Sequence, residues 1–553
     1  MTEVEIRGLA ASPGVAVGRA LLLDAGVADD APHRGAAFEA QTALEALDAV
    51  AADLGARAER LRADGLRAEA EILDANGLMA LDPVLRAEVE RLAADQTAAA
   101  ALRAATLRHA EVLAALDDPL LAARATDVRE LGRRAARRLS GNGTLVAADV
   151  PSVILADDIG PADVADMRES DTAIVALALA AGAATSHAAI MARSLGLPMV
   201  VSAGERLLDA TPGTAIVVDG DAGRAYLDAS AERLGWGRSQ MEQLARKRSR
   251  HAQERALPPV TRDGRWVTLL ANAATTVEAR AAVEMEADGV GLLRTELAFL
   301  EARAWPTEEE HVASLEPLLA LLPGLVATVR VLDFGSDKTP PFLAGIETRG
   351  IELLLDHRDA LDAQLRAILR VAGDTDLRIL LPLVESVEQV RAVRRLLRTM
   401  TGSPPPLGAM IETPVAVRRA HEIALEADFL SIGTNDLVQY TLGLDRAQPL
   451  ATARSAADPR VLSLIAETVA AAHDAGLTIE ICGEAASVPD VATLFVGLGV
   501  DELSVAPARI DEVRTTVRRI SAAEAADAAA AAISGERGNE QGQVLGGLGG
   551  VVA

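Results

Sequence analysis

One histidine in the chain has the surroundings expected of a phosphoryl carrier. Residues 184–193 read A-T-S-H-A-A-I-M-A-R, and His187 directly follows Thr185 and Ser186, either of which can N-cap a helix. At a helix start, unpaired N–H groups and the helix dipole disfavour an imidazolium ion and stabilise an anion carried on the ring. These conditions suit a neutral imidazole that becomes phosphorylated. The plain alternative is a histidine that is simply accommodated at the helix start.

A second set of reactive residues follows strand-like segments in the carboxyl-terminal half. The set comprises Arg294, Arg330, Lys338, Glu412, Asn435, Asp436, Arg446 and Cys482. Arginines offer planar donors to phosphate and carboxylate oxygens, and two carboxylates beside a phosphate are the usual setting for Mg²⁺. We therefore expect a small polyanionic substrate together with Mg²⁺. Taken singly, each residue also has an ordinary interpretation: a surface ion pair for an arginine, an N-cap for a carboxylate, a small core residue for the cysteine.

The elements expected to position this set are the eight βα units of a (β/α)8 barrel. After Pro258, short apolar strands alternate with helical stretches, and eight such units in about 265 residues match the size of this fold. The strands that we expect are 267–271, 289–293, 328–332, 378–381, 407–411, 429–432, 478–481 and 502–505. In such a barrel, the residues that follow the strands face one active-site end.

The histidine is expected in an α/β domain that a helical bundle interrupts. Strand signals occupy 1–20 and 144–228, whereas 21–143 is rich in Ala, Leu, Arg and Glu at helical spacing. The remaining divisions that we expect are a linker helix at 229–260, the barrel at 261–525 and a disordered Gly-rich tail at 526–553.

The composition excludes several classes of protein. Half of the 553 residues are apolar, which indicates a globular chain, and a formal net charge of −26 argues against nucleic-acid binding. A single cysteine excludes an intrachain disulfide. The amino-terminal segment M-T-E-V-E-I-R-G lacks the basic region of a signal peptide, and no apolar run reaches membrane-spanning length. We therefore expect a cytoplasmic protein without membrane insertion.

Nine successive segments carry recognisable motifs. They are S-P-G-V-A-V-G-R-A at 12–20, L-D-D-P-L-L-A-A-R-A-T-D-V-R at 116–129, A-T-S-H-A-A-I-M-A-R-S-L-G-L-P at 184–198, D-G-V-G-L-L-R-T-E at 288–296, P-T-E-E-E at 306–310, R-V-L-D-F-G-S-D-K at 330–338, M-I-E-T-P at 410–414, S-I-G-T-N-D-L-V-Q-Y-T-L-G-L-D-R at 431–446 and I-C-G-E-A-A-S at 481–487. In these motifs and their order, the chain resembles Enzyme I of the phosphoenolpyruvate-dependent sugar phosphotransferase system over about residues 1–520.

This resemblance implies an enzyme that transfers the phosphoryl group of phosphoenolpyruvate (PEP) to its own histidine. The group then passes to the histidine carrier protein HPr and pyruvate is released, as the first step of sugar uptake. The implied parts are a swivelling phosphohistidine domain, an HPr-binding bundle and a PEP-binding barrel that forms a homodimer. By position, His187 resembles the phosphohistidine and Cys482 the acid that protonates the enolate carbon. The other implied roles are substrate binding for Arg294, Arg330, Lys338, Asn435, Asp436 and Arg446, and Mg²⁺ ligation for Glu412 and Asp436.

A few positions depart from the family pattern. Ala183 stands in place of a glycine before T-S-H, and Asn76 in place of a histidine in the helical domain. Beyond Lys338, Arg349 takes the place of one arginine, but Glu352 stands where a second is expected.

Two other interpretations remain open from the sequence. A pyruvate-phosphate dikinase or PEP synthase shares the histidine domain and the barrel. It also needs an ATP-binding domain, for which the chain has neither room nor a G-x-x-x-x-G-K-[ST] loop. The second is a non-catalytic protein that binds PEP and senses its level.

Overall fold

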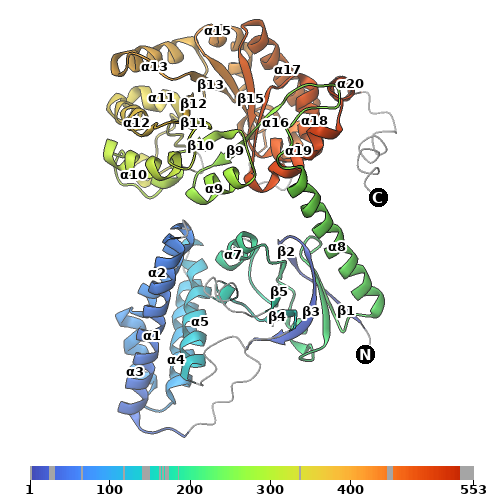
Figure 1. The fold of residues 1–553 in the computed structure, drawn as a ribbon. Coiled ribbons are helices and arrows are strands. Elements are labelled where there is room, and N and C mark those ends of the chain that lie inside the picture. Colours follow the sequence, from blue (N-terminus) through green and yellow to red (C-terminus); the bar gives the residue numbers. More distant parts are fainter. Residues whose placement is uncertain are drawn as a thin grey trace. The chain divides into compact units, whose positions relative to one another are not determined.

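The computed structural model describes residues 3–23, 32–63, 67–115, 119–139, 150–160, 163–164, 167, 173–184, 186–335, 338–444 and 453–535. The chain divides into two compact units, Met1–Arg248 and Ser249–Ala553 (Figure 1). None of the helices within the described residues is both long and apolar enough to cross a membrane.

The first unit contains an eight-stranded mixed sheet with the order β1-β8-β7-β3-β4-β5-β6-β2. The strands are β1 (Val4–Arg7), β2 (Leu9–Ser12), β3 (Val15–Leu22), β4 (Ser152–Ala156), β5 (Ile174–Leu179), β6 (Met199–Val201), β7 (Ala215–Asp219) and β8 (Arg224–Leu227). Strands β3 to β6 pair in parallel, and the remaining pairs are antiparallel. Only Gly8 separates β1 from β2, yet these strands lie at opposite edges, so the sheet curls to bring its edges together.

A helical bundle is inserted between the neighbouring strands β3 and β4. Its helices, blue to cyan in Figure 1, are α1 (Ala36–Ala63), α2 (Arg67–Ala80), α3 (Pro83–Leu92), α4 (Ala98–Ala114) and α5 (Pro119–Leu139). Their core consists almost entirely of Ala and Leu, which pack closely around Leu47, Leu54 and Leu102. After the sheet, α8 (Ala231–Glu254) leads toward the second unit.

The second unit is a closed barrel of eight parallel strands. The strands are β9 (Thr268–Ala273), β10 (Gly289–Arg294), β11 (Val326–Arg330), β12 (Asp376–Leu381), β13 (Leu407–Ile411), β14 (Phe429–Gly433), β15 (Thr478–Cys482) and β16 (Glu502–Val505). The helices are α9 (Thr276–Glu284), α10 (Glu308–Leu319), α11 (Gly350–Asp356), α12 (Arg358–Val371), α13 (Val387–Met400), α14 (Pro414–Arg418), α15 (Ala420–Ala424), α16 (Thr434–Leu442), α17 (Pro459–Asp474), α18 (Pro489–Leu498), α19 (Ile510–Arg519) and α20 (Ala522–Ser534). Their apolar faces and the outer faces of the strands form one continuous core.

The predicted fold class is confirmed, since each of the eight predicted barrel strands overlaps an observed one. Two predicted boundaries are wrong. The boundary after residue 20 cuts β3, which continues to Leu22 because Leu21 and Leu22 pair with β4. The predicted tail from 526 overlaps α20, which continues to Ser534 because its buried Ala525 and Ala529 face α18. The rest of the predicted tail lies outside the described residues.

Candidate active site

The predicted site residues of the barrel gather at one end of it, because all eight strands are parallel and end there. Arg294, Arg330 and Cys482 are the last residues of β10, β11 and β15. Glu412 follows β13, and Asp436 lies in the first turn of α16, directly after β14. Arg446 lies outside the described residues.

Arg330 is the centre of a buried charged cluster. Its Nη2 donates to Glu296 Oε1 at 2.7 Å, and its Nη1 lies 3.1 Å from Asp333 Oδ2. Lys338 Nζ donates to the same oxygen of Glu296 at 2.9 Å. Burial alone raises the pKa of Glu296, but the charges of Arg330 and Lys338 outweigh it and hold that pKa at about 2. The cluster therefore brings two basic side chains and two carboxyl groups into contact inside the barrel end.

A helix behind the cluster holds the ends of two strands together. Gln364 of α12 is fully buried, and its amide donates to Thr295 Oγ1 at 3.0 Å while accepting from Leu332 N at 2.9 Å. Thr295 Oγ1 in turn donates to Arg330 O at 3.0 Å. Gln364 was not predicted as a site residue, because its role depends on a contact between distant parts of the chain.

Arg294 is the available cation of the site. It is half-buried at the end of β10 and forms no hydrogen bond or ion pair with any other described residue. Because Arg330 already has carboxylate partners, Arg294 is the guanidinium most readily offered to an anionic ligand.

Two carboxyl groups, Glu412 and Asp436, interact at the same end of the barrel, beside the Arg330 cluster. Glu412 is only 2% exposed, and its Oε2 accepts from Leu383 N at 2.8 Å. Leu383 has a φ of 49°, a strained left-handed conformation that aims its N–H at Glu412. Burial and the negative charges of Asp436 and Asp333 raise the pKa of Glu412 to about 8. A divalent cation would relieve this repulsion.

The donor set suits Mg²⁺ in its chemistry. Mg²⁺ prefers oxygen ligands and commonly takes one or two carboxylates, with water and substrate phosphate completing its shell. Glu412 and Asp436 supply two such groups. Among the described residues, no group of three or more His, Cys, Asp or Glu side chains is arranged to hold a metal by itself.

Arg349 also belongs to this end of the barrel. Its Nη2 donates to Asp436 Oδ1 at 2.8 Å, and its guanidinium lies over the ring of Tyr440 at 5.8 Å. Gly335 has no side chain, which allows this approach, because a Cβ there would lie 2.7 Å from Arg349 Cβ.

Cys482 lies just below the charged groups, in an apolar layer of the barrel. It is 1% exposed and clusters with Leu292, Leu380, Met410 and Phe429. Burial, with a smaller contribution from the Glu480 carboxyl group, raises the pKa of the thiol to about 12. The sulfur is therefore protonated at neutral pH and can act as a proton donor.

The backbone around Cys482 is held tightly against α16. Thr434 Oγ1 donates to Cys482 O at 3.0 Å, and Asn435 Oδ1 accepts from Glu484 N at 3.3 Å. Gly483 has a φ of 105°, and a Cβ there would lie 2.5 Å from Thr434 Oγ1. Asn435 therefore holds the loop after β15 in place through this hydrogen bond. It also directly precedes Asp436 in the sequence.

His187 is the first residue of α7 (His187–Leu195) in the other unit. Ser186 is the N-cap, and its Oγ accepts from Ala189 N at 3.2 Å. The loop before it is braced from two sides, by residues that were not predicted. Arg193 Nη1 donates to Ala184 O at 3.0 Å, and Ser202 Oγ donates to Gly182 O at 2.6 Å.

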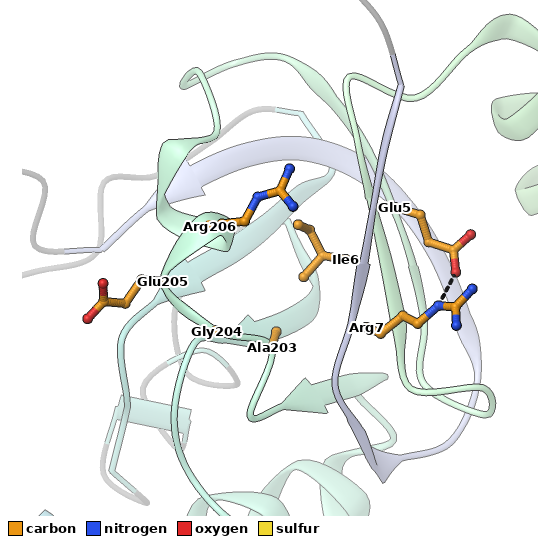
Figure 2. A pocket seen from close by; sticks show the side chains of 7 residues that line it. All are labelled: Glu5, Ile6, Arg7, Ala203, Gly204, Glu205 and Arg206. Carbon is orange, nitrogen blue, oxygen red and sulfur yellow. Dashed lines mark hydrogen bonds and ion pairs between the residues drawn. The ribbon is translucent and has the colours of Figure 1, made fainter.

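Two hollows on the first unit contain none of the predicted site residues. One, of about 430 Å³, lies between β1 and the turn at Ala203–Arg206. Figure 2 shows Glu5 and Arg7 paired with each other at its side, while Glu205 points away. The other is an apolar groove of about 590 Å³ between α3 and α4, lined by Val84 and Val112.

Comparison with known proteins places the chain in a family. Family models match residues 7–124 as the N-terminal domain of PEP-utilising enzymes, 148–223 as their mobile domain and 248–522 as their PEP-binding domain. The phosphoenolpyruvate-protein phosphotransferase of Streptomyces coelicolor is 35% identical over 97% of this chain and 98% of its own length. The chain belongs to the phosphoenolpyruvate-protein phosphotransferase family.

Two further proteins are similar to this chain. The multiphosphoryl transfer protein of Rhodobacter capsulatus is 36% identical over 95% of this chain, and the chain spans only 65% of that relative's length. An NMR structure of Enzyme I (nEIt) is 29% identical and covers 43% of this chain and 99% of its own, with a TM-score of 0.32.

The three positions predicted to depart from the family pattern lie in different environments. Asn76 is 1% exposed inside the bundle, so it presents no side chain at the surface. Glu352 is exposed on α11, whereas Arg349, three residues earlier, reaches Asp436. Ala183 O accepts from Ser186 N at 3.0 Å in the turn before His187, a backbone contact that alanine makes as well as glycine would.

Proposed function

We propose that the protein transfers the phosphoryl group of PEP to His187 and then to a histidine carrier protein of the HPr type, releasing pyruvate. The observation that carries the proposal is the Arg330 cluster beside Glu412 and Asp436 at the carboxyl end of the barrel. Arginines and paired carboxylates at one barrel end suit a small substrate that bears both phosphate and carboxylate.

The cations are proposed to hold the substrate. Arg294, which lacks a partner among the described residues, would bind one anionic group, and Arg330 with Lys338 would supply positive charge beside it. Phosphoryl transfer has a loose transition state, so positioning and charge stabilisation provide most of the catalysis. Glu296 and Asp333 fix Arg330 before substrate arrives, which reduces the reorganisation that transfer requires.

Glu412 and Asp436 are the residues that would hold Mg²⁺. When bound, Mg²⁺ supplies positive charge to the phosphoryl oxygens and lowers the cost of bringing anions together. The contact from Leu383 N to Glu412 keeps one of the two carboxylates oriented.

Cys482 is proposed to complete the reaction by donating a proton to the enolate carbon. Departure of the phosphoryl group leaves the enolate of pyruvate, and a proton on its carbon makes the reaction favour pyruvate. The Cys482 S–H bond would break as that C–H bond forms. Burial keeps the thiol protonated until the enolate is present, since it raises the pKa of Cys482 to about 12.

His187 is proposed as the phosphoryl acceptor. Its place at the start of α7 puts the unpaired N–H groups of the first turn and the positive helix end near a phosphorylated ring. The carrier is proposed to dock on the helical bundle, where the groove between α3 and α4 exposes Val84 and Val112 beside Glu88 and Arg108. Sugar uptake as the destination, a homodimer through the barrel and a cytoplasmic location stay predictions.

The experiment that tests the proposal is incubation with radiolabelled PEP and Mg²⁺. We expect acid-labile label on the wild-type chain and none on His187→Ala. A variant of His421, an exposed histidine of α15, is the matched control and should be labelled normally. A wild-type protein that binds PEP but stays unlabelled would identify it as a non-catalytic PEP sensor.

A further inference from the structure

A fully buried carboxyl group lies behind Cys482 in the barrel. Successive residues of a strand face opposite sides, so Glu480 and Cys482 of β15 face the same side, the barrel interior. Glu480 has no exposed surface, and the side-chain hydroxyls that interact with its carboxyl group are those of Ser431 and Ser504. A fully buried carboxyl group is costly, so its retention requires an explanation.

Ser431 lies between this carboxyl group and the thiol. It is fully buried on β14, where it stands directly opposite Glu480 in the register of the two strands. Its Oγ donates to Cys482 Sγ at 3.5 Å, and the Cys482 S–H in turn faces Ile432 O at 3.6 Å. One hydroxyl therefore neighbours both the thiol and the carboxyl group.

A glycine on another strand of the barrel leaves space for the Glu480 side chain. A Cβ at Gly291 of β10 would lie 2.4 Å from Glu480 Oε1 and 2.8 Å from Ser504 Oγ. The charged groups that face Glu480 are Glu502 and Arg378, which pair with each other at 2.8 Å. Burial, and then the charge of Glu502, raise the pKa of Glu480 well above its usual range, which favours the protonated carboxyl group.

We propose that Glu480 and Ser431 form a proton relay that recharges Cys482 as it protonates the enolate. When the Cys482 S–H bond breaks, the thiolate takes the hydroxyl proton of Ser431, and Ser431 Oγ takes the carboxyl proton of Glu480. Once pyruvate has left, a proton from water in the emptied site returns to the buried Glu480 carboxylate by the reverse route, through Cys482 and Ser431. The relay rests on the proposed function, and its two members are positioning residues that do not touch the substrate.

The test compares two rates in a single turnover, labelling of His187 and formation of pyruvate. In Glu480→Gln and Ser431→Ala, labelling should stay within about twofold of wild type. Pyruvate formation should slow by about 10- to 100-fold, at or below the lower end of what a positioned proton donor contributes. Ser504→Ala is the matched control: it removes a buried hydroxyl that lies beside Glu480 and donates to Asn272 Oδ1, away from the thiol. Both of its rates should be unchanged.

Mixtures of light and heavy water give a readout that packing alone would not move. The wild-type rate of pyruvate formation should fall along a curve as deuterium content rises, because several protons move together. Glu480→Gln and Ser431→Ala should give a straight line, and Glu480→Asp, which keeps an acid, should restore the curve. If Glu480→Gln does not fold by circular dichroism, Ser431→Ala with its smaller change decides the question.

Equal effects on labelling and pyruvate formation, or a straight line in the wild type, would overturn the relay and leave Glu480 and Ser431 as packing residues. Absence of labelling in the wild type would instead overturn the proposed function, and the relay with it.

Discussion

Arg330 illustrates how a residue can be positioned for a ligand by groups of its own chain. It is 4% exposed, and two carboxylates hold its guanidinium in place. Such a buried pair adds little net stability compared with apolar packing, but removing one partner leaves an uncompensated charge. The cluster is therefore better understood as a device for orientation than as a source of stability.

We predict that Glu296→Gln strongly destabilises the barrel. The substitution keeps the size of the side chain but removes the anion that both Arg330 and Lys338 contact. Breaking a buried pair costs about 3–5 kcal/mol, so the urea midpoint of the barrel should fall accordingly. Glu308→Gln, which breaks a surface pair with Arg366, is the control and should cost less than about 1 kcal/mol. Similar losses in both variants would contradict the prediction.

We predict that the buried His311 of α10 makes the stability of the same unit sensitive to acid. It is 1% exposed, packs edge-on against Phe299, and has no hydrogen-bond partner among the described residues. Burial lowers its pKa from 6.5 to about 4, so the unfolded chain takes up a proton at higher pH than the folded one. The stability linked to this group is therefore complete above about pH 6.5 and is lost as the pH falls toward 4.

The loss between pH 7 and pH 5 should be about 2 kcal/mol, measured by urea unfolding at the two values. His311→Phe keeps an aromatic ring against Phe299 and should lose less stability over that interval. If His311→Phe and the wild type show the same pH dependence, the histidine is not responsible.

Which site residues could be predicted depended on how local their signals are. His187 follows its own N-cap, and Arg294, Glu412 and Cys482 stand at strand ends that the sequence marks by apolar runs. The bracing residues have no such local mark. Gln364 acts through contacts with Thr295 and Leu332, which follow β10 and β11 and lie more than thirty residues away in the sequence, so only the folded barrel reveals it.

At the scale of elements, two helices of the bundle form a groove with exposed apolar side chains. Helices α3 and α4 expose Val84 and Val112, which are 68% and 64% accessible, on the walls of one groove. Exposed apolar side chains that line a hollow are typical of binding surfaces.

We predict that Val84→Asp combined with Val112→Asp impairs phosphorylation of the carrier without affecting His187. Charges placed in an apolar interface cost desolvation energy on binding, so the rate of phosphoryl transfer to purified HPr should fall at least about tenfold. Labelling of His187 from PEP should stay unchanged. Leu107→Asp is the control, since Leu107 is exposed on α4 but does not line the groove. Equal impairment by the control would argue against docking in this groove.

The element boundaries that were wrong share a physical cause. β3 extends past residue 20 because a partner strand made about 130 residues later pairs with its last two residues. α20 extends past residue 525 because Gly497 of α18 has no side chain, and a Cβ there would lie 2.1 Å from Ala525 O. Close packing of this kind is set by distant residues, whereas strand type and helix caps are set by neighbouring ones.

At the scale of the whole molecule, the division into two units predicts how the protein unfolds on heating. Because each has its own core, calorimetry should resolve two transitions. PEP with Mg²⁺ should raise only the barrel transition, since a ligand stabilises the unit that binds it by about 2.7 kcal/mol at 100 times its Kd. Arg294→Ala should abolish the shift with little change in the unliganded transition, because its side chain has no partner among the described residues. A shift of both transitions would contradict the assignment.

The order of strands in the first unit has a consequence for synthesis on the ribosome. Val4 at the start of β1 pairs with Leu227 at the end of β8. The first strand of the sheet to be synthesised can therefore pair only after the last one has been synthesised. At about 5–20 residues per second, that interval lasts about 10–45 s. Throughout it, β1 has no strand to pair with on its β8 side, and unpaired strand edges are where aggregation begins. The sheet of the unit that contains His187 is thus completed only after the whole bundle has left the ribosome. We therefore expect the nascent chain to be prone to aggregation in this unit.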